Sequence, residues 1–124
     1  MKTKNEIIVF ANENGLYRWL LNEGYDADLQ SAKLLFEYFD KRNMQLGILN
    51  THLVSISLST GCVTHESVLS CIERALDWNS SAILEMQSYQ SRQTRRRSAH
   101  LSDLWKEQKI LQEFHSSVGK VTVK

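Results

Sequence analysis

Four arginines lie within six residues of this 124-residue chain, at Arg92, Arg95, Arg96 and Arg97. Each guanidinium group carries a permanent charge and five N–H donors, so the cluster can hold carboxylates or phosphates through paired hydrogen bonds. The excess charge is local, because residues 1–91 carry 7 Lys/Arg and 11 Asp/Glu whereas residues 92–124 carry 8 and 3. The cluster predicts contact with an acidic surface of a partner protein. Nucleic-acid contact and a merely solvated turn are the alternatives.

A second candidate for nucleic-acid contact lies at residues 53–74. The sequence there fits a short helix, a turn containing a glycine and a second helix, which is the outline of a helix-turn-helix. The side chains that would face the groove are His65, Ser67, Ser70 and Arg74. Glu66 would then face phosphates, which disfavours this interpretation against an ordinary corner between two helices. A small DNA-binding transcriptional regulator is therefore the alternative function.

Catalytic and metal-binding chemistry has weak support. Cys62 and His65 have the Cys-x-x-His spacing of half a zinc site, and His52 and Cys71 lie in the same region. A structural zinc site needs a second close pair, and a Cys–His catalytic pair needs a third group to orient it. The sequence supplies neither, and it contains no glycine-rich phosphate loop. We therefore expect no enzymatic activity, no metal and no cofactor.

Two heptad seams flank the arginines and indicate the elements that position them. The seams comprise Val68, Ile72, Ala75, Asn79, Ala82, Met86 and Tyr89, and Leu101, Leu104, Gln108, Leu111, His115 and Val118. Helices with this spacing bury the stripe against another helix, and a short polar break favours an antiparallel hairpin. The sequence predicts a long helix over about 65–91 capped by Thr64, a basic turn over 92–97, and a last helix over about 99–117 capped by Ser98.

The polar seam residues allow two interpretations. Asn79, Gln108 and His115 interrupt the apolar stripes. A buried polar residue in such a seam can fix helix register or oligomeric state, whereas a half-exposed one has no such role. The stripes themselves form either the core of one small bundle or, in part, a contact with a second chain. The apolar residues outside the seam of the long helix, such as Trp78, allow a homodimer.

The N-terminal half also favours helices. Asn5 and Asp26 are suitable caps for a first and a second helix, and Leu29, Ala32, Leu35, Phe36 and Phe39 form a helical stripe after the second. Residues 6–10 are rich in β-branched side chains, so a short strand is the alternative there. Residues 44–60 suit a helix, yet alternation of apolar residues with serines over 54–59 suits a strand. We expect helix in both segments, because only Val121 and Val123 offer a partner strand.

These patterns predict an all-α fold of four to five helices, a single domain over residues 1–124 with a C-terminal antiparallel helical hairpin. The absence of proline supports long helices. Two cysteines make no disulfide framework, and no stretch approaches the length of a membrane span, so we expect a cytoplasmic protein without membrane contact. The predicted function is a small non-enzymatic adaptor, inhibitor or regulatory subunit that binds an acidic protein through the hairpin and the arginines.

Overall fold

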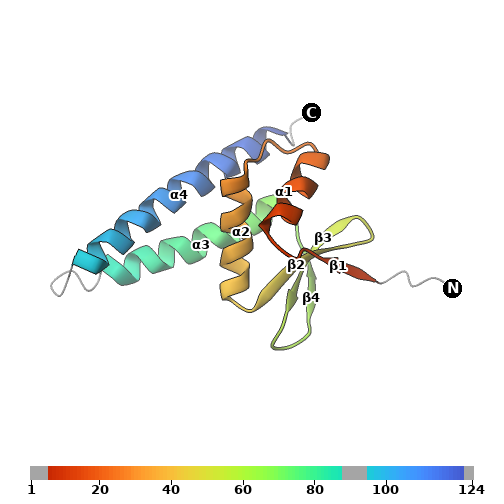
Figure 1. Cartoon of the computed structure of the whole chain (residues 1–124), viewed down its shortest axis with the longest axis horizontal. Coiled ribbons are helices and arrows are strands. Elements are labelled where there is room, and N and C mark those ends of the chain that lie inside the picture. The colour runs from red at the N-terminus through yellow and green to blue at the C-terminus, as the bar shows by residue number, and fades with distance from the viewer. Residues whose placement is uncertain (1–5, 88–94, 122–124) are drawn as a thin grey trace.

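The computed structural model of the chain describes residues 6–87 and 95–121. The elements are β1 (Ile7–Val9), α1 (Glu13–Asn22), α2 (Leu29–Lys41), β2 (Met44–Leu49), β3 (His52–Ser57), β4 (Val63–His65), α3 (Val68–Gln87) and α4 (Arg95–Val121). The four strands form one antiparallel sheet in the order β1-β2-β3-β4. The prediction of an all-α fold is therefore wrong: the described residues form four helices and a sheet, a mixed α/β fold (Figure 1).

The segment 44–57, where we expected a helix, is a β-hairpin. Its strands join through Asn50 and Thr51, whose φ angles are 50° and 69°. Two successive positive φ angles make the two-residue turn that matches the twist of paired strands. The alternation of apolar residues with Ser55 and Ser57 was thus the correct signal. The strands that pair with β3 are β2 and β4, which lie next to it in the sequence rather than at the C-terminus.

β1 is also a strand where we expected a helix. It pairs with β2 in the antiparallel register Ile8↔Ile48, across 40 positions of sequence. A pairing at this distance leaves no local pattern, which is why neighbouring residues gave no partner for the β-branched run. The first helix therefore starts later than predicted, and its cap is Asn12, whose Oδ1 accepts from the Gly15 backbone N–H at 3.2 Å.

Replacing Thr51 by glycine should stabilise the protein by about 1 kcal/mol. A β-branched side chain is strained at positive φ, whereas glycine adopts it freely. The matched change Asn50→Gly should have a smaller effect, because asparagine tolerates this conformation. Urea unfolding of both variants checks the expectation, and equal effects at the two positions would contradict it.

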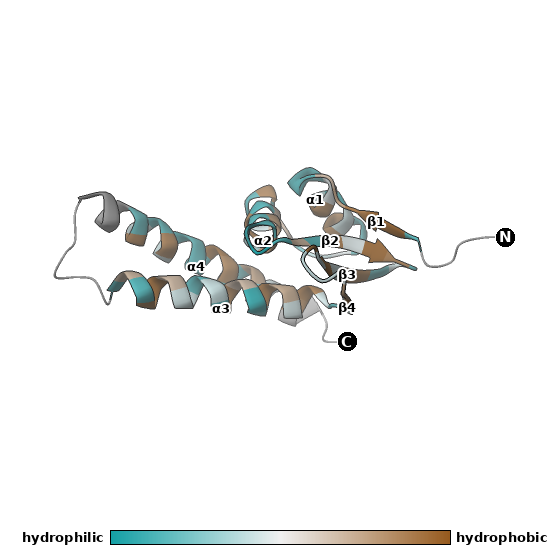
Figure 2. Ribbon diagram, turned by 90° about the horizontal axis from the view of Figure 1, so that it is seen from below, coloured by the Kyte–Doolittle hydropathy of each residue, from teal (hydrophilic) through white to brown (hydrophobic). Residues whose placement is uncertain are grey.

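The second helix begins two residues later than predicted. Asp28, rather than Asp26, is its cap, and Asp28 Oδ1 accepts from the Ser31 backbone N–H at 2.8 Å. Helices α1 and α2 lie together on one side of the strands (Figure 2). They bury Leu16, Leu20, Ala32, Leu34, Leu35, Tyr38 and Phe39 in a core with Leu46 and Leu53 of the sheet and with α3 and α4.

Helices α3 and α4 form an antiparallel hairpin that extends away from the sheet (Figure 1). Glu73 Oε2 lies 3.1 Å from His115 Nε2, and further along α3 the Asn79 Nδ2 donates to the Leu104 carbonyl at 3.0 Å. Later residues of α3 thus contact earlier residues of α4, as antiparallel helices do. The start of α3 is a reciprocal cap between Ser67 and Ser70, with N–H to Oγ distances of 2.9 and 3.0 Å.

The helix ends of the hairpin differ from those predicted. Thr64 lies in β4 and does not cap α3. Ser98 lies inside α4, which starts at Arg95 and includes three of the four clustered arginines. Within the described residues, no helix has both the length and the apolar character needed to cross a membrane.

Candidate functional site

The buried stripe of α3 follows the predicted seam and then drifts. Val68, Ile72, Ala75 and Asn79 are buried, but the next buried residue is Ile83 rather than Ala82. A straight helix repeats every 3.6 residues, so it leaves a 3.5-residue seam after a few turns. Over residues 100–118 of α4, the buried side chains are Leu104, Leu111, Phe114 and Val118, whereas Leu101, Gln108 and His115 are half-buried. Met86 is half-buried, and Tyr89 lies outside the described residues.

A polar node joins the hairpin to α2. Asn79 is fully buried, and its Nδ2 donates to Tyr38 Oη and to the Leu104 carbonyl, both at 3.0 Å. Tyr38 Oη donates in turn to Glu107 Oε1 at 2.8 Å. Three helices thus meet through one asparagine. Because each bond fixes a direction, the node sets the position of the hairpin relative to the rest of the fold.

Burial raises the pKa of Tyr38 to about 12 from an ordinary value of 10.0, and the bond to Glu107 adds to the rise. The folded protein therefore holds the phenolic proton more tightly than the unfolded chain. This contribution to stability is complete below pH 10 and is lost as pH rises through about 12.

Tyr38→Phe should therefore flatten the fall in unfolding free energy between pH 10 and pH 12. Urea unfolding of wild type and variant across this range measures the difference. A parallel fall in both proteins would show that Tyr38 does not cause it.

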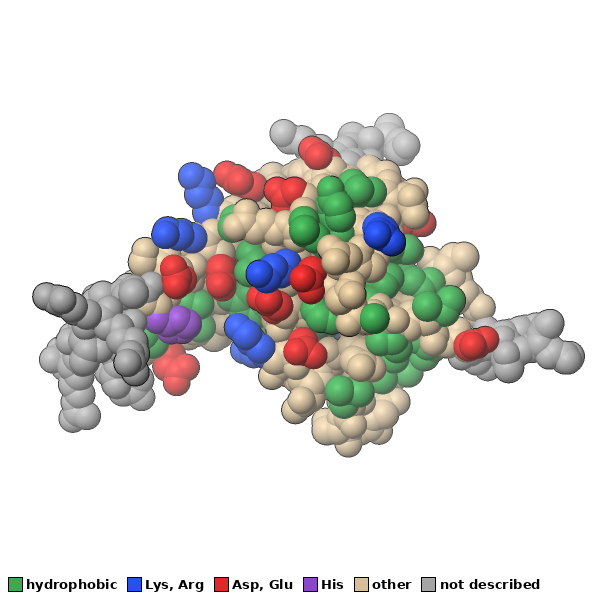
Figure 3. All heavy atoms as spheres, viewed as in Figure 1, with side chains coloured by type: hydrophobic (Ala, Val, Ile, Leu, Met, Phe, Trp, Pro, Cys, Tyr) green, Lys and Arg blue, Asp and Glu red, His purple; other side chains and the backbone are tan. Residues whose placement is uncertain are grey.

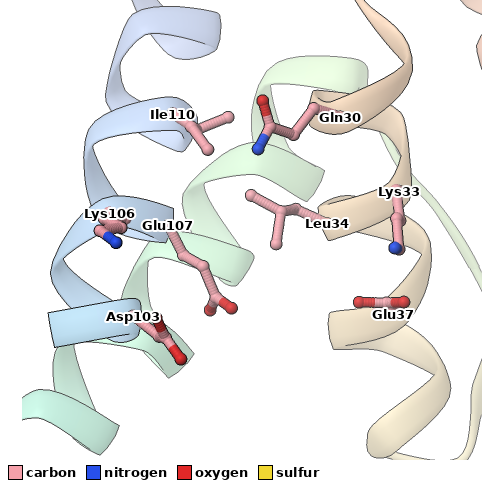
Figure 4. A pocket seen from close by; sticks show the side chains of 8 residues that line it. All are labelled: Gln30, Lys33, Leu34, Glu37, Asp103, Lys106, Glu107 and Ile110. Atoms are coloured by element: carbon pink, nitrogen blue, oxygen red, sulfur yellow. The ribbon is translucent and has the colours of Figure 1, made fainter. Parts of the chain in front are cut away.

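A charged groove lies beside this node, between α2 and α4. It has a volume of about 300 Å³. Its lining residues are Gln30, Lys33, Leu34, Glu37, Asp103, Lys106, Glu107 and Ile110 (Figure 4). Two lysines and three carboxylates line it, and Glu107 points into the space between the helices. Such mixed charge fits a solvated surface, and no described group of three or more His, Cys, Asp or Glu side chains is placed to hold a metal ion.

A second polar cluster surrounds Glu66. The Glu66 side chain is only 4% exposed, and it pairs with Arg74. Ser55 Oγ and Ser70 Oγ donate to its carboxylate at 2.7 and 2.9 Å. The Arg74 guanidinium also lies 5.1 Å from the Phe39 ring centroid. Three side chains, Ser55 from β3 and Ser70 and Arg74 from α3, thus satisfy one buried charge.

This cluster explains where the residues predicted to face nucleic acid lie. Ser70 and Arg74 meet through Glu66, and Ser67 and Ser70 cap α3. His65 is exposed in β4, with its ring centroid 6.0 Å from that of His52. The helix-turn-helix outline is wrong, because residues 52–57 are a strand. Whether His65, Ser67, Ser70 and Arg74 contact nucleic acid in another way stays a prediction.

The two cysteines lie in different environments and do not come together as the zinc or catalytic site considered from the sequence. Cys62 is exposed and free, whereas Cys71 is free and fully buried in α3. Burial raises the pKa of the Cys71 thiol, and the nearby Glu66 carboxylate raises it further. A thiol held in its neutral form is a poor nucleophile and a poor metal ligand.

Three of the four clustered arginines lie at the start of α4. Arg92 lies outside the described residues, and so do the side chains of Arg95, Arg96 and Arg97, although their backbone begins α4. The described part of the hairpin carries two exposed large apolar side chains, Leu84 at 67% and Trp105 at 48%. Leu84 lies outside the predicted seam. Its position outside the seam is the one sign in the sequence that this side chain is exposed.

Helical geometry gives the direction of these two side chains. Each residue turns an α-helix by about 100°. Trp105 therefore points about 200° away from Glu107, which faces α2, and Leu84 points about 140° away from Asn79. Both lie on the part of the hairpin that α2 leaves uncovered. No family model, curated protein or solved structure matches the chain.

Proposed function

We propose that this protein is a non-enzymatic binding module, acting as an adaptor, inhibitor or regulatory subunit, that engages an acidic surface of a partner protein through the α3–α4 hairpin. The observation that carries the proposal is the exposure of Trp105 and Leu84 on a hairpin that extends away from the sheet (Figure 1). Tryptophan and arginine are the residues most enriched among those that dominate binding energy at protein interfaces.

The contact would combine apolar and charged groups. The two exposed side chains supply apolar area. A dense positive charge comes from Arg92, Arg95, Arg96 and Arg97, which begin eight residues after Leu84 and end eight residues before Trp105. Desolvated apolar contacts hold such a complex together, while the arginines steer association and select an acidic partner. The two free cysteines fit a reducing compartment, and we propose the cytoplasm as the location.

Capture of the partner from native extract tests the proposal. Replacing the four arginines by serine should abolish capture at low salt, whereas replacement by lysine should retain much of it because the charge remains. Trp105→Ser should abolish capture too. The matched change Leu58→Ser removes an apolar side chain of similar exposure, 55%, on the turn after β3, and it should leave capture intact.

Nuclease treatment of the extract distinguishes a protein-binding adaptor from a DNA-binding regulator. A protein retained after nuclease and lost in both hairpin variants supports the adaptor function. Recovery that depends on nucleic acid would instead favour the DNA-binding regulator. Capture that survives all four arginine replacements would show that the cluster is only a solvated turn.

A further inference from the structure

One backbone edge of β1 faces away from the rest of the sheet, because β1 is the first strand in the order β1-β2-β3-β4. The backbone N–H of Phe10 donates to the Leu46 carbonyl at 3.0 Å. In an antiparallel pair, residues that bond inward alternate with residues whose N–H and C=O groups point outward. Since Phe10 and therefore Ile8 bond to β2, Ile7 and Val9 present their backbone groups to the open edge.

An apolar groove lies beside this edge. It has a volume of about 430 Å³, and Ile8, Trp19 and Ile48 form its apolar wall. Ile8 is 68% exposed, more than any other large apolar side chain described. Figure 3 shows hydrophobic side chains gathered on the β1–α1 side of this face, whereas charged ones gather over α2 and α4. The open edge thus adjoins apolar surface that no described element covers.

Among the described residues, the charge on the rim of the groove is negative. Glu6 and Glu23 are the charged side chains there, and no lysine or arginine from residues 6–87 or 95–121 lines the groove. Successive side chains of an extended chain alternate between faces, so Glu6, the residue before β1, and Ile8 lie on the same face, about 7 Å apart. A strand added at this edge would meet an apolar position and an acidic position at a spacing of two residues.

We propose that the β1 edge binds an extended segment of a partner protein, which adds to the sheet next to Ile7–Val9 and carries an apolar residue opposite Ile8 with a lysine or arginine two positions away. Backbone hydrogen bonds to Ile7 and Val9 supply affinity, and the groove supplies sequence preference. This surface is separate from the hairpin and opposite to the arginine cluster in charge.

A second copy of the chain fits this edge less well. Antiparallel pairing of two β1 edges about Ile8 would place Glu6 of each copy opposite Phe10 of the other, since both lie two residues from Ile8. Each Glu6 would then face an aromatic ring rather than a cation. Opposite charges paired across two strands are favourable, so a basic foreign segment is the better complement.

Titration of the isotope-labelled full chain with a defined peptide tests the proposal by nuclear magnetic resonance. The probe is acetyl-Thr-Lys-Thr-Ile-Thr-Lys-amide, which has a lysine two positions from isoleucine in either strand direction. We expect the amide signals of Ile7 and Val9 to shift and their hydrogen exchange to slow. A peptide with glutamate in place of both lysines should bind about tenfold more weakly. N-methylation of the two threonines beside isoleucine should abolish binding.

A charge-reversed protein provides the matched control. Glu23→Lys should weaken binding of the lysine peptide about fivefold, whereas Glu113→Lys, an exposed reversal on α4, should not change it. Equal affinity for the lysine and glutamate peptides, or shifts confined to residues away from β1, would overturn the proposal. Concentration-dependent dimerisation through β1 without peptide binding would overturn it in favour of a second copy.

Discussion

Phe39→Ala is expected to lower the free energy of unfolding by about 4 kcal/mol. The Phe39 side chain is 1% exposed and belongs to the core shared by α2, α3 and the sheet. Its ring meets that of Trp78 edge-on at 5.0 Å and lies under the Arg74 guanidinium. The substitution therefore leaves a cavity and also removes an aromatic pair and a cation–π contact.

Phe36→Ala on the same helix is the matched control. Phe36 is half-buried, so its loss should cost about 1–2 kcal/mol. Urea unfolding followed by circular dichroism gives both values. Phe39→Leu, expected to cost about 1–2 kcal/mol, keeps the measurement available if the alanine variant does not fold. Similar losses for Phe36→Ala and Phe39→Ala would mean that Phe39 is not the centre of this core.

Arg74→Met should cost about 2–3 kcal/mol, because it leaves the Glu66 carboxylate buried with only two serine hydroxyls. Arg74 is 36% exposed, so solvent moderates the loss relative to a fully buried pair. The double variant Glu66→Gln with Arg74→Met removes the unpaired charge and should recover at least half of the loss. The two single variants and the double variant form a cycle that isolates the interaction.

The exposed pair on the hairpin is the comparison for this cycle. Glu73 and His115 have side chains 57% and 37% exposed. His115→Ala should therefore change stability by no more than about 0.5 kcal/mol. A loss as large as that of Arg74→Met would show that burial of Glu66 does not set the size of the effect.

The hairpin could be predicted from the sequence because its contacts repeat locally. The spacing of Val68, Ile72 and Ala75 predicts a buried stripe, and all three side chains are buried in the structure. Asn79 stood out as a polar interruption of that stripe. Its partner Tyr38 did not, because a hydrogen bond between residues 41 positions apart leaves no trace in either segment.

The sheet was missed for a related physical reason. The apolar residues of 44–57 satisfy both a helical and an alternating pattern, and strand pairing decides between them. The deciding contacts are the turn at Asn50 and Thr51 and the register with β4. The sequence places Ser70 and Arg74 among the side chains that would face nucleic acid, whereas the structure turns both of them, together with Ser55, onto the Glu66 carboxylate.

The distant pairing of β1 has a consequence for the order of folding. Three residues register against a strand 40 positions away, so β1 must close a long loop for few contacts, whereas the β2–β3 hairpin closes over two residues. We expect β1 to be the last strand to join the sheet and the first to leave it. When β1 leaves, β2 becomes the edge, and at high protein concentration β1 of another molecule competes with the protein's own β1 for the free backbone groups. Strand exchange between copies is therefore the characteristic misassembly of this fold at high concentration.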